Sequence, residues 1–302
     1  FKECKPDVVL VHGDTTTTLA SAMAAFYRGI PVGHIEAGLR SGNLNRPFPE
    51  EANRIITDRL SALWFAPTEG AADNLRRENL PLSEKSLFVT GNTVIDALHK
   101  ALEKEYTPSG PLLSLADGDG PLILATAHRR ESWGKPMESI CLAIKDILSS
   151  HSEVRVLFPL HKNPLVREVI EGCLANEDRV LMCEPLDYPE FVWAMNRSSL
   201  ILTDSGGVQE EAPSLGKPVL VMRENTERPE AVVAGTVKLI GTHRQRLVDE
   251  VSLLMDSDEA YAGMANAVNP YGDGQAAERT IEAIKWKFSG GPRPEDFSGQ
   301  AG

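Results

Sequence analysis

Short apolar runs alternate with helix-like segments along almost the entire chain, and this alternation constrains the fold more than any other feature. Four runs of strand type, from DVVLVHG to SLFVTG, precede residue 105, and six more, from PLILATAH to TVKLIG, follow residue 120. Near-continuous apolar strands that alternate with helices are typical of parallel sheets covered on both faces. We therefore predict an α/β fold made of two doubly wound domains.

The length of the chain and its turn-forming residues divide this pattern into domains. The 302 residues suffice for two ordinary domains, and the stretch 106–120, rich in Pro, Gly and Ser, is predicted to link them. The domains are then 1–105 and 121–270. A helical pattern at 271–288 is expected to return to the first domain, and residues 289–302 are predicted to be disordered.

The first domain has fewer strands than this architecture usually requires. A doubly wound nucleotide-binding domain carries about six strands, whereas four apolar runs lie before residue 105. We therefore expect the first domain to be incomplete, with the chain starting inside it.

Charge and cysteine content exclude several classes of protein. A net charge of −12 argues against a nucleic-acid partner, which needs a basic surface. No apolar run approaches the ~20 residues that cross a bilayer, and the four cysteines show neither a CxxC pattern nor zinc-like spacing. We expect a cytoplasmic protein with free thiols, no metal, and no membrane or nucleic-acid partner.

Polar side chains follow the predicted strands, where open α/β sheets bind their ligands. Asp14 follows the first strand, Glu36 the second, and His128 the first strand of the second domain, while Glu50 opens the helix after Pro49. Each has a structural alternative. Asp14 or Thr15 would cap a helix, and His128 would be an ordinary loop histidine. The negative charge of Glu50 would only interact favourably with the dipole at the start of its helix.

The segment TDSGGVQEEAPSLGKPV, residues 203–219, carries the clearest binding signal. Its small residues allow backbone N–H groups to approach a ligand at the start of a helix, which favours an anion such as a diphosphate. Glu211 lies further along and would accept hydrogen bonds from ribose hydroxyls. The alternative is a plain tight turn with Ser205 as the helix cap. The motifs GxSxG, HExxH and GxGxxG are absent.

A set of long segments, in this order, resembles the bacterial non-hydrolysing UDP-N-acetylglucosamine 2-epimerases over about residues 6 to 288. The segments are VHGDTTTT, GHIEAGLRSGN, FPEEANR, APTE, VTGNTVID, TAHRRES, FPLHKNP, LTDSGGVQEEAPSLGKPVLVMRENTERPEAV and NPYGDGQAAERT. The resemblance implies two Rossmann-like domains of the glycosyltransferase-B type, with the nucleotide sugar between them. It implies interconversion of UDP-N-acetylglucosamine and UDP-N-acetylmannosamine without a nicotinamide or metal cofactor, a homodimer, and activation by substrate at a second site.

The resemblance also assigns roles to individual residues. The acid/base candidates are Asp14, Glu36, Glu50 and His128. The substrate-binding candidates are Ser205, Gly206 and Gly207 at the diphosphate, Glu211 at the ribose and Arg228 at a phosphate. Arg40 and Arg129 are candidates for the activator site.

The implied reaction accounts for several carboxylates around one small sugar. The C2 proton is not next to a carbonyl, so the family route breaks the C1–O bond to UDP as C2 loses its proton. This gives 2-acetamidoglucal, and UDP adds back while a proton reaches the opposite face of C2. Such a route needs acid/base groups on two faces of the ring and donors that hold UDP.

The start of the chain departs from the family pattern, because the Gly-Thr-Arg-Pro-Glu-like loop of the family is absent. The missing part is on the order of 80 residues, or two to three βα units of ~30 residues each. This predicts a truncated chain, which leaves two alternatives open. One is a UDP-binding module without turnover, and the other is a hydrolysing epimerase that releases N-acetylmannosamine and UDP. A retaining glycosyltransferase of the same fold is disfavoured by the acidic set with His128.

Overall fold

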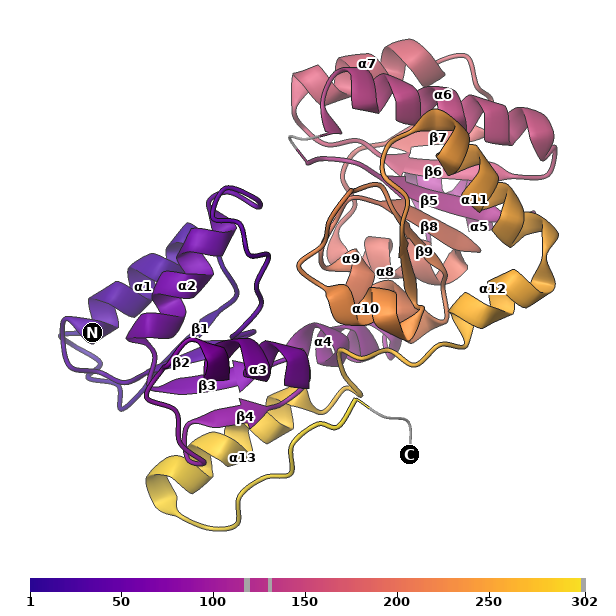
Figure 1. Cartoon of the computed structure of the whole chain (residues 1–302). Helices are drawn as coiled ribbons and strands as arrows, with labels where there is room; N and C mark the ends of the chain where they lie inside the picture. Colours follow the sequence, from indigo (N-terminus) through magenta and orange to yellow (C-terminus); the bar gives the residue numbers. More distant parts are fainter. Residues whose placement is uncertain (117–119, 130–131, 300–302) are drawn as a thin grey trace. The chain divides into compact units, whose positions relative to one another are not determined.

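The computed structural model of the protein describes residues 1–116, 120–129 and 132–299. The chain divides into two compact units, coloured from indigo to yellow along the sequence in Figure 1. The first unit comprises Phe1–Ala97 and Pro270–Gly302, and the second comprises Leu98–Asn269. The division falls within helix α4 (Thr93–Leu102), before the boundary predicted at residue 105.

The first unit is built on a parallel sheet in the order β1-β2-β3-β4. Its strands are β1 (Val9–His12), β2 (Val32–Ile35), β3 (Leu63–Ala66) and β4 (Leu87–Val89). Its further helices are α1 (Thr16–Phe26), α2 (Glu50–Leu60), α3 (Glu69–Arg77) and α13 (Ala276–Ser289). The described strands of this sheet follow chain order, so no switch point occurs among them.

Side chains of β3 alternate between two helical layers, as expected for a strand covered on both faces. Leu63 and Phe65 belong to a buried cluster with Ala283 of α13. Trp64 and Ala66 belong to another cluster, with Ala and Leu side chains of α3. Figure 1 shows α13, in yellow, running along the sheet beside β4. The last helix of the chain therefore completes the core of the first unit.

The second unit contains a six-stranded parallel sheet in the order β10-β9-β8-β5-β6-β7. Its strands are β5 (Leu122–Thr126), β6 (Arg155–Pro159), β7 (Val180–Cys183), β8 (Leu200–Thr203), β9 (Val219–Val221) and β10 (Val237–Leu239). The direction of the strand order reverses between β5 and β8. This is the switch point of a doubly wound sheet, where the loops after neighbouring strands diverge and leave a crevice.

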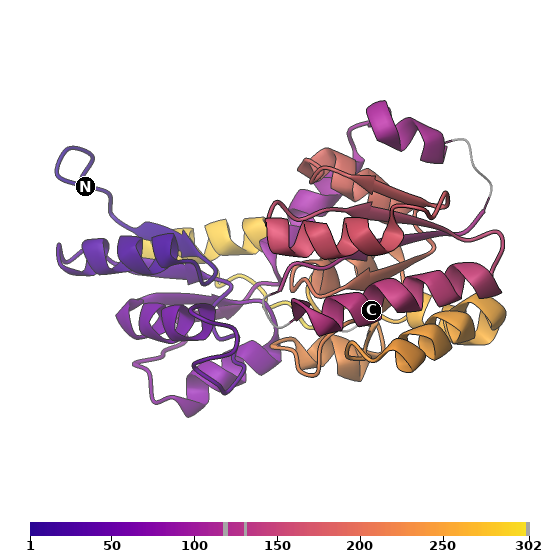
Figure 2. The ribbon, with the colours of Figure 1, turned by 90° about the horizontal axis from the view of Figure 1, so that it is seen from above.

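Helices of the second unit fill the connections between its strands. They are η1 (Gly110–Leu112), α5 (Leu113–Ala116), α6 (Lys135–Ser150), α7 (Pro164–Leu174), α8 (Tyr188–Arg197), α9 (Val208–Glu211), η3 (Ala212–Leu215), α10 (Pro229–Ala234), α11 (Arg244–Asp256) and α12 (Asp258–Ala265). Apolar side chains of α6, α7 and α11 form one buried cluster with the sheet. Figure 2 shows α6 and α11 side by side. Within the described ranges, no helix is long and apolar enough to cross a membrane.

The predicted α/β class with two parallel sheets is confirmed, and all ten predicted strands are present. Two segments differ from their prediction. The stretch predicted as a linker, 106–120, contains η1 and α5, where Leu112 and Leu115 are buried, although its residues 117–119 lie outside the described ranges. Its high content of Pro and Gly hid these two apolar contacts.

The segment predicted as a disordered tail, 289–302, makes specific contacts as far as it is described. Asp296 accepts a hydrogen bond from the Val89 N–H at 3.0 Å, and the Phe297 N–H donates to the Val89 carbonyl at 2.8 Å. The segment thus pairs with the free edge of β4, a pairing that local composition cannot reveal. Residues 300–302 lie outside the described part.

The start of α13 generates a first prediction, because its cap comes from a distant helix. Gln275 at the cap position makes no side-chain cap bond. Instead, Asp96 of α4 accepts hydrogen bonds from the N–H groups of Ala276 and Ala277, at 3.1 and 2.8 Å. We expect Asp96→Ala to lower the free energy of unfolding by about 1–2 kcal/mol, as for loss of a helix cap, measured by urea denaturation.

The matched control is Asp73→Ala, which removes an exposed ion pair with Arg76. This change is expected to alter the free energy of unfolding by less than about 0.5 kcal/mol. Equal effects of the two substitutions would contradict the capping role of Asp96.

Candidate active site

The first unit gathers buried and half-buried charged groups at the carboxyl ends of β1 and β2. Asp14 follows β1, and its Oδ2 lies 2.5 Å from Nη2 of Arg54 on α2. The cap of α1 is supplied by Thr15, whose side chain accepts from the Thr18 N–H. Asp14 is therefore not needed as a helix cap, and its carboxylate remains 29% exposed beside one cation.

Glu36 ends β2 with a left-handed backbone conformation, at φ 68°, which is uncommon for a residue other than glycine. Its Oε2 lies 2.9 Å from the position that a Cβ atom at Gly13 would take, so a side chain at residue 13 would displace this carboxylate, and the left-handed φ of 69° at Gly13 also favours glycine. Asn92 donates to Oε1 at 3.3 Å, and His12 Nε2 lies 3.7 Å from Oε2. The carboxylate of Glu36 thus lies directly over the residue that precedes Asp14.

Glu50 and Glu51 open helix α2 but have different surroundings. Glu51 is buried, and its Oε1 accepts from the N–H groups of Ser41 and Gly42 at 2.9 and 3.0 Å, which fixes the loop after β2. Glu50 is half-buried, and its buried Oε2 has no hydrogen-bond partner among the described residues. Glu50 also lies one helical turn before Arg54, on the same face of α2. The carboxylate of Glu51 is therefore used to hold the loop, whereas one oxygen of Glu50 has no described partner.

Asp58, near the end of α2, connects the loops that carry Asp14 and Glu36. Its Oδ1 lies 2.6 Å from Nδ1 of His34, whose Nε2 lies 2.8 Å from the Gly13 carbonyl oxygen. Its Oδ2 accepts from Arg40 at 2.8 Å and from the Gly38 N–H at 3.3 Å. Burial by itself would lower the pKa of His34, but Asp58 and the Gly13 carbonyl outweigh it and raise that pKa.

Arg40, a candidate for an activator site, has its donors engaged within this network. Besides Asp58, it contacts Glu78 through two nitrogens, at 2.6 and 3.0 Å, and its own neighbour, the Leu39 carbonyl, at 2.7 Å. Burial would lower the pKa of Arg40, and its two carboxylate partners raise it. These contacts support a structural role for Arg40, and its place in an activator site stays a prediction.

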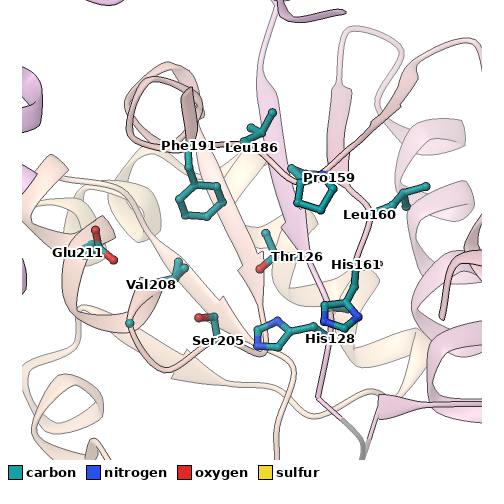
Figure 3. Close-up of a pocket in the computed structure, with 13 residues that line it drawn as sticks. Thr126, His128, Pro159, Leu160, His161, Leu186, Phe191, Ser205, Val208 and Glu211 are labelled. Carbon is teal, nitrogen blue, oxygen red and sulfur yellow. The ribbon is translucent and has the colours of Figure 1, made fainter. Parts of the chain in front are cut away.

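The second unit contains a pocket of about 300 Å³ at the carboxyl ends of β5, β6, β7 and β8, next to the switch point. Its lining is mainly apolar, with polar groups at intervals, as is common for small-molecule sites. Figure 3 shows its arrangement. The lining residues are Thr126, Ala127, His128, Pro159, Leu160, His161, Pro185, Leu186, Phe191, Ser205, Gly207, Val208 and Glu211.

Asp204 organises the side of the pocket that holds His128. The buried carboxylate accepts hydrogen bonds from the N–H groups of His128 and Arg129 at 2.9 and 2.8 Å, and from the Ser132 hydroxyl at 3.1 Å. His128 Nδ1 also lies 3.1 Å from Oδ1 of Asp204. The His128 ring stacks on that of His161, with centroids 6.0 Å apart, as Figure 3 shows. Asp204 thereby leaves Nε2 of His128 for a ligand.

The turn at Ser205–Gly207 differs in detail from its prediction. The cap of α9 is Gly207, and α9 is a single turn continued by η3, so Ser205 is not a helix cap. Among the described residues, no acceptor pairs with the N–H groups of Gly206 and Gly207. A Cβ atom at Gly206 would lie 2.5 Å from a nitrogen of Arg228. Packing against Arg228 therefore requires a glycine at this position.

Arg228 lies behind this turn rather than in the lining of the pocket. Its guanidinium donates to Glu210, and to Glu227 at 2.5 Å, while Arg223 lies 3.1 Å from the other oxygen of Glu227. Burial would raise the pKa of Glu227, but Arg228 and Arg223, with a smaller effect of Arg129, lower it to about 2. The direct phosphate contact of Arg228 and the activator role of Arg129 stay predictions, since neither residue lines the pocket.

Glu211 lines the pocket with a carboxylate that is 7% exposed. Burial raises its pKa to about 7, although a hydrogen bond from the Tyr188 hydroxyl to Oε2, at 2.7 Å, acts in the opposite direction. Within the described ranges, no group of three or more His, Cys, Asp or Glu side chains could hold a metal ion.

The structure places the predicted residues in two groups, and three further residues stand beside them that the sequence analysis did not name as candidates. Of the predicted residues, Glu36 lies against Gly13, which directly precedes Asp14, and Glu50 opens α2 in the same unit. His128, Ser205, Gly207 and Glu211 line the pocket of the second unit. The residues missed are the His34–Asp58 pair and Tyr188. The motif DYPE, a helix start directly after β7, was an available signal for Tyr188, because it places residues at a strand's carboxyl end.

Comparison with known proteins identifies one family over nearly the whole chain. The family model described as UDP-N-acetylglucosamine 2-epimerase matches residues 1–285. A protein of Escherichia coli K12 named UDP-N-acetylglucosamine 2-epimerase is 53% identical over 292 residues, which cover 94% of this chain and 76% of that protein.

Solved structures of similar proteins agree with the fold. A putative UDP-N-acetylglucosamine 2-epimerase from Listeria monocytogenes has a TM-score of 0.92 and 48% identity, covering 97% of this chain and 77% of that one. The UDP-GlcNAc 2-epimerase from Neisseria meningitidis was solved with UDP-GlcNAc bound. It has a TM-score of 0.87 and 48% identity, and the match covers 94% of this chain and 77% of that one. These similarities confirm the predicted fold class.

The raised pKa of Glu211 generates a second prediction, on stability against pH. Because this pKa is about 7 in the folded protein instead of 4.5, ionisation disfavours the fold. The stability that the neutral group provides is fully present below pH 4.5 and is lost as the pH rises through 7. We expect Glu211→Gln, which cannot ionise, to raise the free energy of unfolding at pH 8 by up to roughly 3 kcal/mol.

This gain should shrink as the pH falls to 5.5, and urea denaturation at both pH values measures it. Glu168→Gln, at an exposed position on α7, serves as the control and should have little effect at either pH. A gain that is the same at pH 8 and pH 5.5 would show that ionisation of Glu211 is not its cause.

Proposed function

The chain belongs to the UDP-N-acetylglucosamine 2-epimerase family and is an isomerase, and we propose that it interconverts UDP-N-acetylglucosamine and UDP-N-acetylmannosamine by elimination and re-addition of UDP. The observation that carries this proposal is the placement of two carboxylates beside Gly13 in the first unit. Glu36 lies over Gly13, and Asp14 is the next residue along the chain. Inversion at C2 requires groups that accept and donate protons on the two faces of the ring, and these two carboxylates are our candidates for that role.

The proposed reaction balances through one unsaturated intermediate. A base removes the proton from C2, the C2–H electron pair forms a C1=C2 double bond, and the C1–O bond breaks with its electrons leaving on UDP. The product is 2-acetamidoglucal beside UDP. In the return step, an acid delivers a proton to the opposite face of C2, and an oxygen of the UDP β-phosphate attacks C1.

Asp14, Glu36 and Glu50 are assigned to the two proton transfers. Arg54 and Asn92 hold the first two carboxylates, while Oε2 of Glu50 has no described partner and remains available to a substrate hydroxyl or proton. Positioned carboxylates of this kind contribute by general acid–base catalysis. The assignment of base and acid among the three is decided by the direction of the reaction.

UDP is assigned to the pocket of the second unit. The free N–H groups of Gly206 and Gly207 are suited to phosphate oxygens, and Glu211 is suited to the hydroxyls of ribose. His128, with Nδ1 held by Asp204, presents Nε2 to the phosphate that leaves and returns. The complex of the Neisseria meningitidis protein with UDP-GlcNAc supports a nucleotide-sugar ligand for this chain.

A homodimer and a cytoplasmic location, expected from the sequence, stay predictions. The distinction between a hydrolysing and a non-hydrolysing epimerase rests on the product. Our proposal requires UDP-N-acetylmannosamine, whereas hydrolysis would release N-acetylmannosamine and UDP.

The third prediction tests the elimination route directly. Because the proton removed from C2 is not the one returned, turnover in heavy water should place deuterium at C2 of the UDP-N-acetylmannosamine formed. Proton NMR and mass spectrometry of the isolated product measure this. A product without deuterium at C2 would exclude elimination, and accumulation of free N-acetylmannosamine would identify a hydrolysing enzyme.

The fourth prediction concerns the two carboxylates. We expect Asp14→Asn and Glu36→Gln each to lower kcat by at least ~100-fold, the lower end for a positioned acid or base, with little change in UDP affinity. A coupled epimerase assay and calorimetry with UDP measure the two quantities. The control is Glu69→Gln, at an exposed carboxylate on α3, which should retain normal turnover.

Near-normal turnover of both variants would show that Asp14 and Glu36 serve only to hold Arg54 and Asn92. Circular dichroism of each variant separates loss of chemistry from loss of folding.

A further inference from the structure

Tyr188 and Glu211 form a pair at one end of the pocket in the second unit. Tyr188 is the first residue of α8 and Glu211 the last of α9, and the tyrosine hydroxyl donates to Oε2 at 2.7 Å. Glu211 lines the pocket, whereas Tyr188 does not. Tyr188 therefore acts on a ligand only through the carboxylate that it holds.

The second oxygen of Glu211 is the one left for a ligand. Oε1 lies on the side of Gly207, 3.5 Å from the position that a Cβ atom there would take. No donor among the described residues reaches Oε1, although the side chain is more than nine-tenths buried. An ionised carboxylate only accepts hydrogen bonds. Oε1 is thus an acceptor on a largely buried side chain, close to a pocket-lining glycine, and no donor to it is described.

The rest of the pocket offers no substitute for this acceptor at the same end. Figure 3 shows Glu211 apart from His128 and His161, with Val208 and Ser205 between them. The nearby wall is apolar and includes Phe191 and Val208. A ligand hydroxyl that donates at this end has Glu211 as its side-chain acceptor, while the neighbouring Gly207 N–H can only donate.

Tyr188 is not required to start its own helix. Asp187 is the cap of α8, and it forms a reciprocal capping box with Glu190. The Tyr188 side chain is 40% exposed, so removal of its hydroxyl leaves no buried cavity. The hydrogen bond to Glu211 is the described contact that this hydroxyl makes.

We propose that the Tyr188 hydroxyl fixes Glu211 with Oε1 toward Gly207, and that this pair makes the pocket select a ribonucleotide over its deoxy counterpart. The inference rests on the proposed function, which takes the ligand to be a uridine nucleotide. A site built around a buried acceptor rejects a ligand without the matching hydroxyl, because the acceptor then stays unpaired. Tyr188 is a positioning residue, and Glu211 makes the contact.

The pair also predicts how ligand binding depends on pH. Burial raises the pKa of Glu211 to about 7, and the Tyr188 hydrogen bond favours the ionised form. The other titratable side chains that line the pocket are His128 and His161. Loss of the Tyr188 hydroxyl should therefore move the onset of tight nucleotide binding to higher pH, whereas the contribution of the two histidines stays the same.

Calorimetry with UDP, 2′-deoxy-UDP and 3′-deoxy-UDP tests the inference on the wild-type protein and on Tyr188→Phe, between pH 6 and pH 8.5. We expect the wild type to bind UDP at least ~100-fold more tightly than one of the deoxy compounds. Tyr188→Phe should lower UDP affinity by about 10-fold and leave that deoxy compound almost unaffected. In turnover, KM should rise while kcat changes little.

Tyr106→Phe is the matched control, because the Tyr106 hydroxyl also donates to a carboxylate of the second unit, Glu190 at 3.2 Å, and neither residue lines the pocket. It should leave all three affinities and the pH profile unchanged. Thermal unfolding of both variants verifies that each is folded.

Three results would overturn the inference. Equal affinity of the wild type for UDP and both deoxy compounds would exclude selection, and unchanged UDP affinity in Tyr188→Phe would exclude the positioning role. An equal loss for all three nucleotides, without a shift of the pH profile, would show an effect on pocket shape alone. Each leaves UDP binding, and hence the proposed function, in place. Absence of UDP binding by the wild type would instead remove the proposed nucleotide site itself.

Discussion

A buried aspartate carboxylate at the carboxyl ends of the strands is the interaction on which each candidate site depends. In the first unit, Asp58 binds His34, Arg40 and the Gly38 N–H at once. His34 in turn contacts the Gly13 carbonyl. The loops that carry Asp14 and Glu36 are therefore both attached to one residue of α2. A buried carboxylate is tolerated here because each of its oxygens has a charged or N–H partner.

A buried aspartate also joins two loops in the second unit, at the switch point of the sheet. Asp204 follows β8 and accepts from two successive N–H groups of the loop after β5, at His128 and Arg129. These strands are neighbours in the sheet although they lie far apart in the chain. Parallel strands end at one edge with loops that lack partners of their own, and a buried acceptor ties two of them together. The position of His128 thus depends on Asp204.

The two units divide the chemical work of the proposed reaction between them. The first has the carboxylates of Glu36 and Asp14 beside Gly13, which suits the proposed proton transfer at a carbon. The pocket of the second is lined by two histidines and the carboxylate of Glu211, and no acceptor among the described residues pairs with the N–H groups of Gly206 and Gly207, which suits a nucleotide. Behind the Gly206 turn, Glu227 is held between Arg228 and Arg223. Removing one partner of a buried ion pair typically costs about 3–5 kcal/mol, so loss of any of these three side chains is expected to destabilise the second unit.

The sequence by itself determined the α/β class and the ten strands, and it supplied the candidate site residues, whose roles stay predictions. Periodicity, glycine positions and the polar residues that follow strands are local properties, and Asp14, Glu36, His128 and Ser205 were found in this way. The long motifs of the resemblance indicated the family before any geometry was known, and the similar proteins confirm it.

Only the tertiary structure decided which of these residues have partners. Asp58 and His34 are 24 residues apart, Asp204 and His128 are 76 apart, and Asp96 caps a helix 180 residues further along. Such pairs carry no periodic signal, because each depends on how strands are ordered in the sheet. The same holds for the last described segment, whose contacts with β4 were invisible in its Gly- and Pro-rich sequence. Local residue patterns specify elements, whereas burial and long-range hydrogen bonds specify which side chains remain free to act.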